Sequence, residues 1–308
     1  MSEMWLAVEG GGTKTRVLLA DTECAIVARA VGGPASPMYI KQGEYLRKVL
    51  PMLKRIKRLA DKAGGQVSTA GFGGPMATGI VMNAVRSVFG EVHVVHAGEM
   101  EIALAVNGLR HGVALIAGTG ATCAGITPDG KRASCGGFGA QFGDEGCGYW
   151  IGREAVAAAR RANEGRGPQS SLGARLCEFY AIGTLTHILR FCDKSGHVPV
   201  PKVAACVPCV FEAARDGDVV AKSICRAAGR ALGRLLVAVV ERLGHEEPVP
   251  VAMTGGVFNG GPLILKSFHR ILRESGFAYT VFPPVPEPTV GIFKYIERER
   301  EKEMNGVS

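Results

Sequence analysis

The chain has 308 residues, which is long for a single hydrophobic core and favours two domains. Apolar residues make up 47% of the sequence and charged residues 21%, a balance typical of globular proteins. Apolar runs fall well short of the ~20 residues that a membrane helix needs, so we expect no membrane partner. A net charge of +8 suits attraction of an anionic nucleotide. Because no stripe of basic and aromatic residues occurs, we predict no nucleic-acid partner.

Nine cysteines are present, and their odd number together with the lack of a secretory leader predicts free thiols in a reducing compartment. We therefore expect a cytoplasmic protein. Cys206 and Cys209 form one close pair, and no second pair stands at the spacing of a structural zinc site. Buried free thiols are the simpler interpretation, although the sequence does not decide whether these two pair or bind a ligand.

Strands and helices alternate through the first hundred residues. Residues 4–31 predict a three-stranded meander, and apolar residues at helical spacing predict a helix over 43–63. Further strands and helices alternate over residues 67–72, 80–89, 92–95 and 99–107. This alternation predicts an α/β domain.

The second half of the chain repeats the hairpin with which the first half begins. Residues 113–127 run from one apolar strand through a Gly-Thr-Gly turn into another, as residues 6–21 do through a Gly/Thr turn. Helices follow, the clearest over 219–243, then a strand over 248–253 and a terminal helix near 290–302. A duplicated hairpin predicts two similar domains whose turns grip a polyphosphate.

Three turns that follow apolar strands are candidate nucleotide contacts: the first turn (10–14), the second turn (118–120) and the third turn (255–256). Glycines let backbone N–H groups approach phosphate oxygens, and threonines add hydroxyl donors. The candidate residues are Gly11, Gly12, Thr13, Lys14, Gly118, Thr119, Gly120, Gly255 and Gly256. The plainer alternatives are a simple hairpin turn for the first and a strand-to-helix turn for the third.

Glu9 ends the first predicted strand, directly before the first turn. A carboxylate beside phosphates is costly unless a divalent cation or its water separates the charges. Glu9 is therefore the candidate metal residue, and MgATP the candidate cofactor. The first turn is not a Walker loop, because no Gly-Lys-Ser/Thr follows at the required spacing.

The chain resembles the sugar kinase/Hsp70/actin superfamily of ATPases. Within it, the chain is similar to the N-acetylglucosamine kinase group of the benzoyl-CoA reductase/2-hydroxyglutaryl-CoA dehydratase activator ATPase family. The motifs that carry the resemblance lie at residues 8–13, 118–120, 135–152 and 254–257, the third being the most specific. The resemblance covers residues 5 to about 295 and implies an α/β protein with two ribonuclease H-like (actin-like ATPase) domains around a central cleft.

The resemblance also implies a domain division and an assembly. A small N-terminal domain over residues 1–110 would hold sugar and phosphate, and a larger domain over 111–287 would bind the nucleotide. The terminal helix, within residues 288–308, would return to the first domain. A homodimer is the family expectation.

The implied reaction is phosphoryl transfer from MgATP to the 6-hydroxyl of N-acetylglucosamine, with glucosamine, muramic acid derivatives and glucose as alternatives. The implied substrate contacts are Ser36, Gly73, Gly74, Gly137, Phe138, Gly139 and Asp144. Phe138 stands where the kinases usually have tryptophan, and Ser36 falls near a sugar-binding asparagine of related kinases. Asp144 would accept hydrogen bonds from sugar hydroxyls or help to orient magnesium.

The expected general base departs from the family pattern. The family has an aspartate in a phrase of the form Asp-Ala-x-x-Ala-Leu, after a strand and at the start of a helix. Alignment on Ala103 and Leu104 puts Glu99 in that place, whereas alignment on the strand end puts Ala97 there and leaves no base. We favour Glu99, because the helix dipole stabilises a carboxylate at a helix start and a glutamate can accept a hydroxyl proton.

Two other functions are weighed against a sugar kinase. One is an ATPase activator that couples hydrolysis to a partner enzyme, which a missing base at Ala97 would favour. The cluster cysteines of those activators have patterns absent from this chain. The other is a sugar-sensing regulator, for which the sequence offers no DNA-binding segment.

Overall fold

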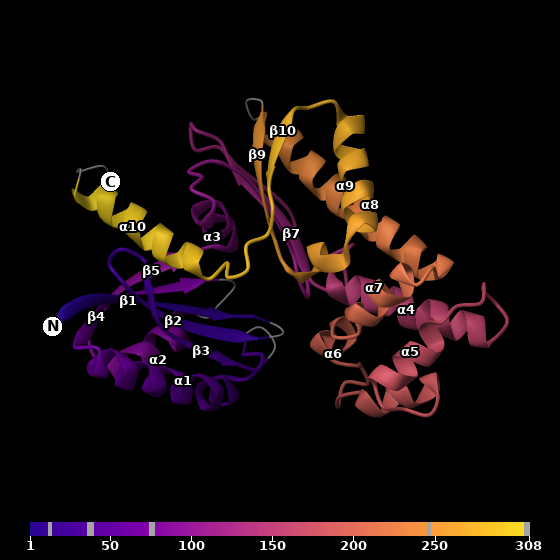
Figure 1. Cartoon of the computed structure of the whole chain (residues 1–308), viewed down its shortest axis with the longest axis horizontal. Helices are drawn as coiled ribbons and strands as arrows, with labels where there is room; N and C mark the ends of the chain where they lie inside the picture. Colours follow the sequence, from indigo (N-terminus) through magenta and orange to yellow (C-terminus); the bar gives the residue numbers. More distant parts are fainter. Residues whose placement is uncertain (12–13, 36–39, 74–77, 245–247, 305–308) are drawn as a thin grey trace. The chain divides into compact units, whose positions relative to one another are not determined.

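The computed structural model describes residues 1–11, 14–35, 40–73, 78–244 and 248–304. The chain forms two compact units (Figure 1). Unit 1 comprises Met1–Arg110 and Val285–Ser308, and unit 2 comprises His111–Pro284. The chain therefore passes from unit 1 into unit 2 after Arg110 and returns to unit 1 at Val285.

Unit 1 is built on a five-stranded sheet with the order β3-β2-β1-β4-β5. Its strands are β1 (Ser2–Gly10), β2 (Thr15–Asp21), β3 (Ile26–Gly32), β4 (Gly65–Gly73) and β5 (His93–Ala97). Short connections in the sequence join β1, β2 and β3, which pair antiparallel. Helical crossovers lead to β4 and β5, which pair parallel to β1 and β4 respectively.

Helices cover both faces of this sheet: α1 (Gln42–Lys62), α2 (Thr78–Phe89), α3 (Glu99–Val106) and α10 (Val290–Met304). Alternate residues of β1 point to opposite faces. Leu6 and Val8 pack into the core under α1 and α2, while Trp5 and Ala7 pack with α3 and α10. Within unit 1, Figure 1 shows α1 and α2 on one side of the strands and α10 on the other.

Glycines in β4 allow α10 to pack directly on the sheet. A Cβ atom on Gly71 would lie 2.2 Å from Ile292 Cγ2, and one on Gly73 would lie 2.5 Å from the Ile102 side chain. Gly291 makes the matching approach from α10, because its Cβ would lie 2.3 Å from the Ile102 carbonyl oxygen of α3. The last helix of the chain is thus part of the unit 1 core.

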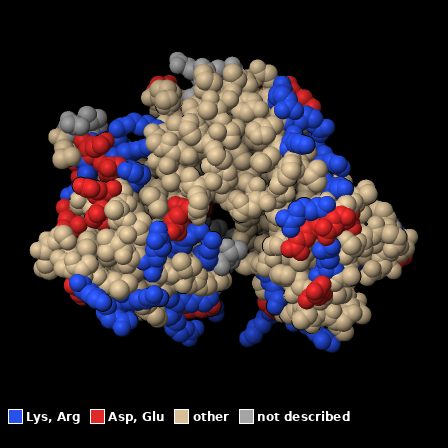
Figure 2. Space-filling model, in the orientation of Figure 1, with Lys and Arg blue, Asp and Glu red and all other residues tan. Residues whose placement is uncertain are grey.

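Much of the positive charge of the chain lies on α1. This helix carries seven Lys and Arg residues against two acidic ones. Its apolar residues recur every three or four positions and are buried, so the basic side chains lie on the outer face, as Figure 2 shows along the lower edge of unit 1. The excess positive charge of the chain therefore lies largely on a solvated helix face.

Unit 2 repeats the strand arrangement of unit 1. Its strands are β6 (Gly112–Ala117), β7 (Ala121–Ile126), β8 (Arg132–Gly136), β9 (Val249–Thr254) and β10 (Tyr279–Phe282). The order is β10-β9-β6-β7-β8, with β6, β7 and β8 antiparallel and with β9 and β10 parallel to β6. This is the unit 1 order read from the other edge. The predicted fold class of two similar α/β domains is confirmed.

Unit 2 carries the larger set of helices: α4 (Gly148–Asn163), α5 (Leu172–Phe179), η1 (Leu185–Phe191), α6 (Val200–Ala204), α7 (Val207–Arg215), α8 (Val219–Leu243), η2 (Gly256–Gly260) and α9 (Pro262–Ser275), where η marks a 3₁₀ helix. Cys206 and Cys209 are both buried and free, as expected. No helix in the described ranges has the length and apolar character to cross a bilayer.

Close packing of α8 on α9 generates a stability prediction. A Cβ atom on Gly229 would lie 2.3 Å from the Ile264 carbonyl oxygen, so Gly229→Ala forces the two helices apart. We expect the free energy of unfolding to fall by about 1–3 kcal/mol, the usual cost of overpacking. Urea denaturation measures it.

Gly43→Ala is the matched control, because Gly43 lies in α1 with open space around its Cα. There the better helix propensity of alanine should add up to ~1 kcal/mol. Equal stability of the two variants would contradict the close contact between α8 and α9.

Candidate functional site

The second turn is held by the start of α4. The Gly118 N–H donates to the Gly120 carbonyl oxygen (2.9 Å), which closes the turn. Gly148 and Tyr149, the first residues of α4, donate backbone hydrogen bonds to the carbonyl oxygens of Gly118 (2.7 Å) and Thr119 (3.1 Å). A Cβ atom on Gly148 would lie 2.9 Å from the Gly118 oxygen, so this approach requires glycine.

The third turn lies directly against the second. Gly255 has φ +111°, and a Cβ atom on it would lie 2.2 Å from the Ala117 carbonyl oxygen and 2.9 Å from the Gly118 nitrogen. Only glycine combines this backbone conformation with such a close approach. The structure therefore brings together two of the three turns that the sequence proposed as nucleotide contacts.

Asp144 also lies against the second turn. The residue is 6% exposed, and its Oδ1 atom is buried with no hydrogen-bond partner among the described residues. A Cβ atom on Gly120 would lie 2.6 Å from Asp144 Oδ2, so the carboxylate touches this glycine. Burial raises the pKa of the Asp144 carboxyl.

Asp144 also holds an unusual backbone conformation, with φ +61°. A left-handed non-glycine residue and a buried carboxylate oxygen without a partner both oppose stability. Such a combination is typical of a functional site rather than of a structural contact. From the sequence, Asp144 was predicted to contact the sugar or to orient magnesium. In the structure it contacts Gly120, which belongs to the turn predicted to bind phosphate.

The loop between β8 and α4 carries the other predicted sugar contacts. Gly137 and Gly139 have positive φ, and the Gly137 N–H donates to the Ala121 carbonyl oxygen (2.9 Å). Phe138 is 79% exposed and Phe142 is 78% exposed. Phe142, in the same glycine-rich loop, was not among the predicted sugar contacts.

Unit 1 places several predicted residues in one row across its sheet. Glu9 of β1 pairs with Gly73 of β4, and Gly73 pairs with Ala97 of β5. All three positions lie at the carboxyl ends of parallel strands, where open α/β sheets bind ligands. Gly11 donates to the Lys14 carbonyl oxygen (3.0 Å) and so closes the first turn, and Lys14 is exposed. Gly12, Thr13, Ser36 and Gly74 lie outside the described residues.

The Glu9 carboxylate is paired with an arginine. Arg16 Nη1 lies 3.2 Å from Glu9 Oε2, and the Thr289 hydroxyl donates to the same oxygen. Arg16 also pairs with Glu287 (3.4 Å), on the segment that returns from unit 2. Arg16 was missed, yet the hairpin register sets it directly opposite Glu9, where cross-strand partners are expected.

Glu99 is the first residue of α3 and is exposed. Its position matches the expectation of a carboxylate at a helix start. Ala97, which the alternative alignment puts in the place of the base, is buried at the end of β5. A second carboxylate, Glu101, lies in the same turn, with its Oε2 atom 2.3 Å from where a Cβ on Gly98 would stand.

Two units with the strand order of ribonuclease H-like domains define an actin-like ATPase fold. The BadF/BadG/BcrA/BcrD ATPase family matches residues 6–292, and the chain belongs to this family. The resemblance inferred from the motifs is confirmed.

Two relatives and one solved structure illustrate the similarity. The chain is 29% identical over 277 residues to the N-acetylmuramic acid/N-acetylglucosamine kinase of Clostridium acetobutylicum, covering 87% of this chain and 90% of that protein. It is 28% identical over 274 residues to the N-acetyl-D-glucosamine kinase of Dictyostelium discoideum, covering 82% and 85%. A proposed N-acetylglucosamine kinase from Porphyromonas gingivalis shares the fold, with a TM-score of 0.73, 20% identity, and coverage of 97% of this chain and 100% of that one.

The buried Asp144 carboxylate generates a pH-dependent stability prediction. Because burial raises its folded-state pKa above the ordinary value of 3.8, ionisation of Asp144 opposes folding. Its contribution to stability is present at low pH and is lost as the pH rises through the folded-state pKa. Asp144→Asn should therefore unfold at a higher temperature than the wild type at pH 7. The difference in unfolding temperature between the two proteins should become small and constant when the pH falls below the pKa values of carboxyl groups.

Asp129→Asn is the control, for which we expect the opposite change in unfolding temperature at pH 7. Thr127 donates to the Asp129 carboxylate and holds the pKa of that carboxyl below its ordinary value. Loss of this ionised group should lower the unfolding temperature at pH 7 and have no effect at low pH. Thermal scans from pH 3 to pH 8 distinguish the two; a pH-independent effect of Asp144→Asn would show that its carboxylate is not desolvated.

Proposed function

We propose that the chain is an ATP-dependent amino sugar kinase that transfers the γ-phosphoryl group of ATP to the 6-hydroxyl of N-acetylglucosamine. The observation that carries the proposal is the buried carboxylate of Asp144, one oxygen of which has no partner among the described residues, against a glycine turn in a chain of the BadF/BadG/BcrA/BcrD family. Both named relatives above act on N-acetylglucosamine by name. Glucosamine, a muramic acid derivative or glucose are the substrates to compare.

Unit 2 is proposed to hold the nucleotide. The backbone of the second turn and the Thr119 hydroxyl would bind phosphate oxygens. Gly255 and Gly256 would let the adenosine approach the backbone, since Gly256 has open space where a side chain would stand. Unit 1 would supply the first turn and the sugar side, including Ser36, Gly73 and Gly74. Phe138, with Gly137 and Gly139, would present an apolar surface to the sugar ring.

The chemistry of the donors fits a magnesium ion held mainly by phosphates and water. No group of three or more His, Cys, Asp or Glu side chains that could hold a metal occurs in the described part of the chain. Magnesium commonly takes only one or two protein carboxylates and keeps its waters. Asp144 offers an unpaired oxygen, and Glu9 offers a carboxylate already balanced by Arg16. Bound magnesium would neutralise charge on the transferred phosphoryl group.

Glu99 is proposed to take the proton from the attacking sugar hydroxyl. Phosphoryl transfer needs little covalent help from the protein, so positioning and charge neutralisation supply most of the rate. The start of α3 favours the ionised glutamate, which keeps it able to accept a proton. Exclusion of water would prevent hydrolysis in place of transfer.

The second candidate function is an ATPase that drives a conformational change in a partner protein. Its specific support is Ala97, which is buried at the end of β5. One alignment puts Ala97 in the place of the general base, and an alanine side chain cannot accept a proton. Such a switch needs nucleotide binding more than it needs deprotonation of a hydroxyl. A cytoplasmic homodimer is proposed for either function.

The general base is tested by Glu99→Gln, with Glu101→Gln as the matched control from the same turn. ADP release is measured with MgATP and a panel of hexoses and amino sugars. We expect Glu99→Gln to lower kcat by about a hundredfold or more with a small change in KM, since general bases contribute about 10²–10⁴. Glu101→Gln should stay near wild type.

Each outcome of this assay is informative. If Glu101→Gln loses activity and Glu99→Gln does not, the base is Glu101. If both variants retain turnover, the base lies elsewhere. ADP release without any dependence on sugar would reject the kinase in favour of the ATPase switch.

The role of Glu9 is tested by a magnesium titration of Glu9→Gln. Glu287→Gln is the matched control, because Glu287 pairs with the same Arg16 but does not belong to the hairpin that carries the first turn. We expect Glu9→Gln to raise the magnesium concentration for half-maximal activity about tenfold, which corresponds to ~1.4 kcal/mol. Similar shifts in both variants would mean that Glu9 serves only to hold Arg16.

A further inference from the structure

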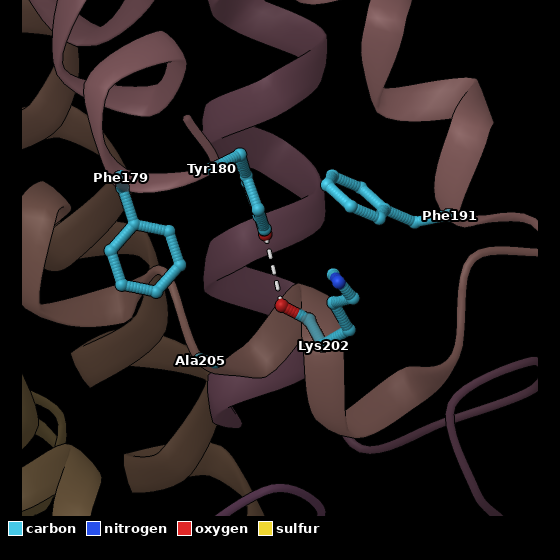
Figure 3. A pocket seen from close by; sticks show the side chains of 5 residues that line it. All are labelled: Phe179, Tyr180, Phe191, Lys202 and Ala205. Carbon is cyan, nitrogen blue, oxygen red and sulfur yellow. Dashed lines mark hydrogen bonds between the residues drawn. The ribbon is translucent and has the colours of Figure 1, made fainter. Parts of the chain in front are cut away.

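A second candidate ligand site lies among the helices of unit 2, apart from the three turns. A cavity of about 370 Å³ is lined by Phe179, Tyr180, Phe191, Lys202 and Ala205, whose side chains are drawn in Figure 3. These residues come from the end of α5, the end of η1 and the region of α6. The volume lies within the range of small-molecule pockets.

Three aromatic rings form the apolar part of the wall. Phe179 and Tyr180 meet edge to face, with centroids 4.9 Å apart, and Tyr180 and Phe191 are tilted with centroids 5.6 Å apart. Phe179 remains 44% exposed, although such a ring is usually buried. Ring faces and edges of this kind favour a flat ligand.

The charged group of the wall is Lys202. Its Nζ atom lies 3.5 Å from the centroid of the Phe191 ring, a cation–π contact that holds the ammonium at the cavity (Figure 3). The Tyr180 hydroxyl donates to the Lys202 carbonyl oxygen (2.9 Å), so this phenol is already used. The cavity therefore offers an apolar surface and one cation.

The short helix α6, which carries Lys202, is firmly held. A Cβ atom on Gly152 of α4 would lie 2.3 Å from the Val203 carbonyl oxygen, so α6 packs directly on α4. The Cys206 thiol donates to the same oxygen (3.2 Å). A pocket whose wall is already ordered loses less conformational freedom when a ligand binds.

We propose that this cavity binds a small, flat ligand that carries a single negative charge, such as an aromatic carboxylate or sulfonate. The aromatic rings would receive the ring system of the ligand, and Lys202 would pair with its anionic group. The proposal is independent of the kinase function, because none of the lining residues belongs to the predicted sugar or nucleotide contacts.

The test uses two fluorescent probes that differ only in charge. 1-Anilinonaphthalene-8-sulfonate carries a sulfonate, and N-phenyl-1-naphthylamine is its neutral counterpart. We expect saturable binding of the sulfonate to the full chain at one site, and about tenfold weaker binding by Lys202→Gln. The neutral probe should not distinguish the two proteins. Equal affinity of the sulfonate for wild type and Lys202→Gln would overturn the proposal.

A second variant locates the bound probe. Ala205→Trp should fill the cavity and abolish binding, with its folding checked by circular dichroism. Val219→Ser, which removes another exposed apolar side chain of unit 2, should bind as the wild type does. Binding that survives Ala205→Trp, or that is lost in Val219→Ser, would put the probe elsewhere. If the wild type binds no probe and Ala205→Trp instead changes the sedimentation rate, the face is a contact between copies of the chain.

Discussion

The candidate nucleotide site depends on close approaches between backbones that side chains would prevent. Gly255 rests on the Ala117 carbonyl oxygen, and Gly148 rests on that of Gly118. These contacts hold the second turn between the end of β9 and the start of α4. A single added Cβ atom would separate these elements, because it would fall within 3 Å of a backbone atom. The glycine content of the chain is thus partly a requirement of the site.

Beside the second turn, Asp144 has two features that oppose the stability of the fold. A buried carboxylate oxygen without a partner opposes folding, and a left-handed backbone adds to this cost. Glu9 in unit 1 differs, because its carboxylate pairs with Arg16 and accepts a hydrogen bond from the Thr289 hydroxyl. One carboxylate therefore has an oxygen without a partner among the described residues, whereas the other is already balanced.

Much of this arrangement could be predicted from the sequence, because it depends on local patterns. The repeated hairpin predicted two similar domains, and apolar spacing located α1 and α8. The contact between Glu9 and Arg16 was also within reach, since hairpin register is a local property. The contact of Asp144 with Gly120 was not, because it joins residues in two different loops. Neither was the aromatic cavity, whose lining residues come from separate helices that had no individual prediction.

The sequence by itself determined the alternation of strands and helices and the three glycine-rich turns, because periodicity and turn chemistry act over a few neighbouring residues. The family followed from the resemblance of its motifs to those of known ATPases. Only the tertiary structure decided which of these features meet. It brought the second and third turns together, aligned Glu9 with Gly73 and Ala97, and desolvated Asp144. The physical reason is that burial and close approach depend on how distant segments pack.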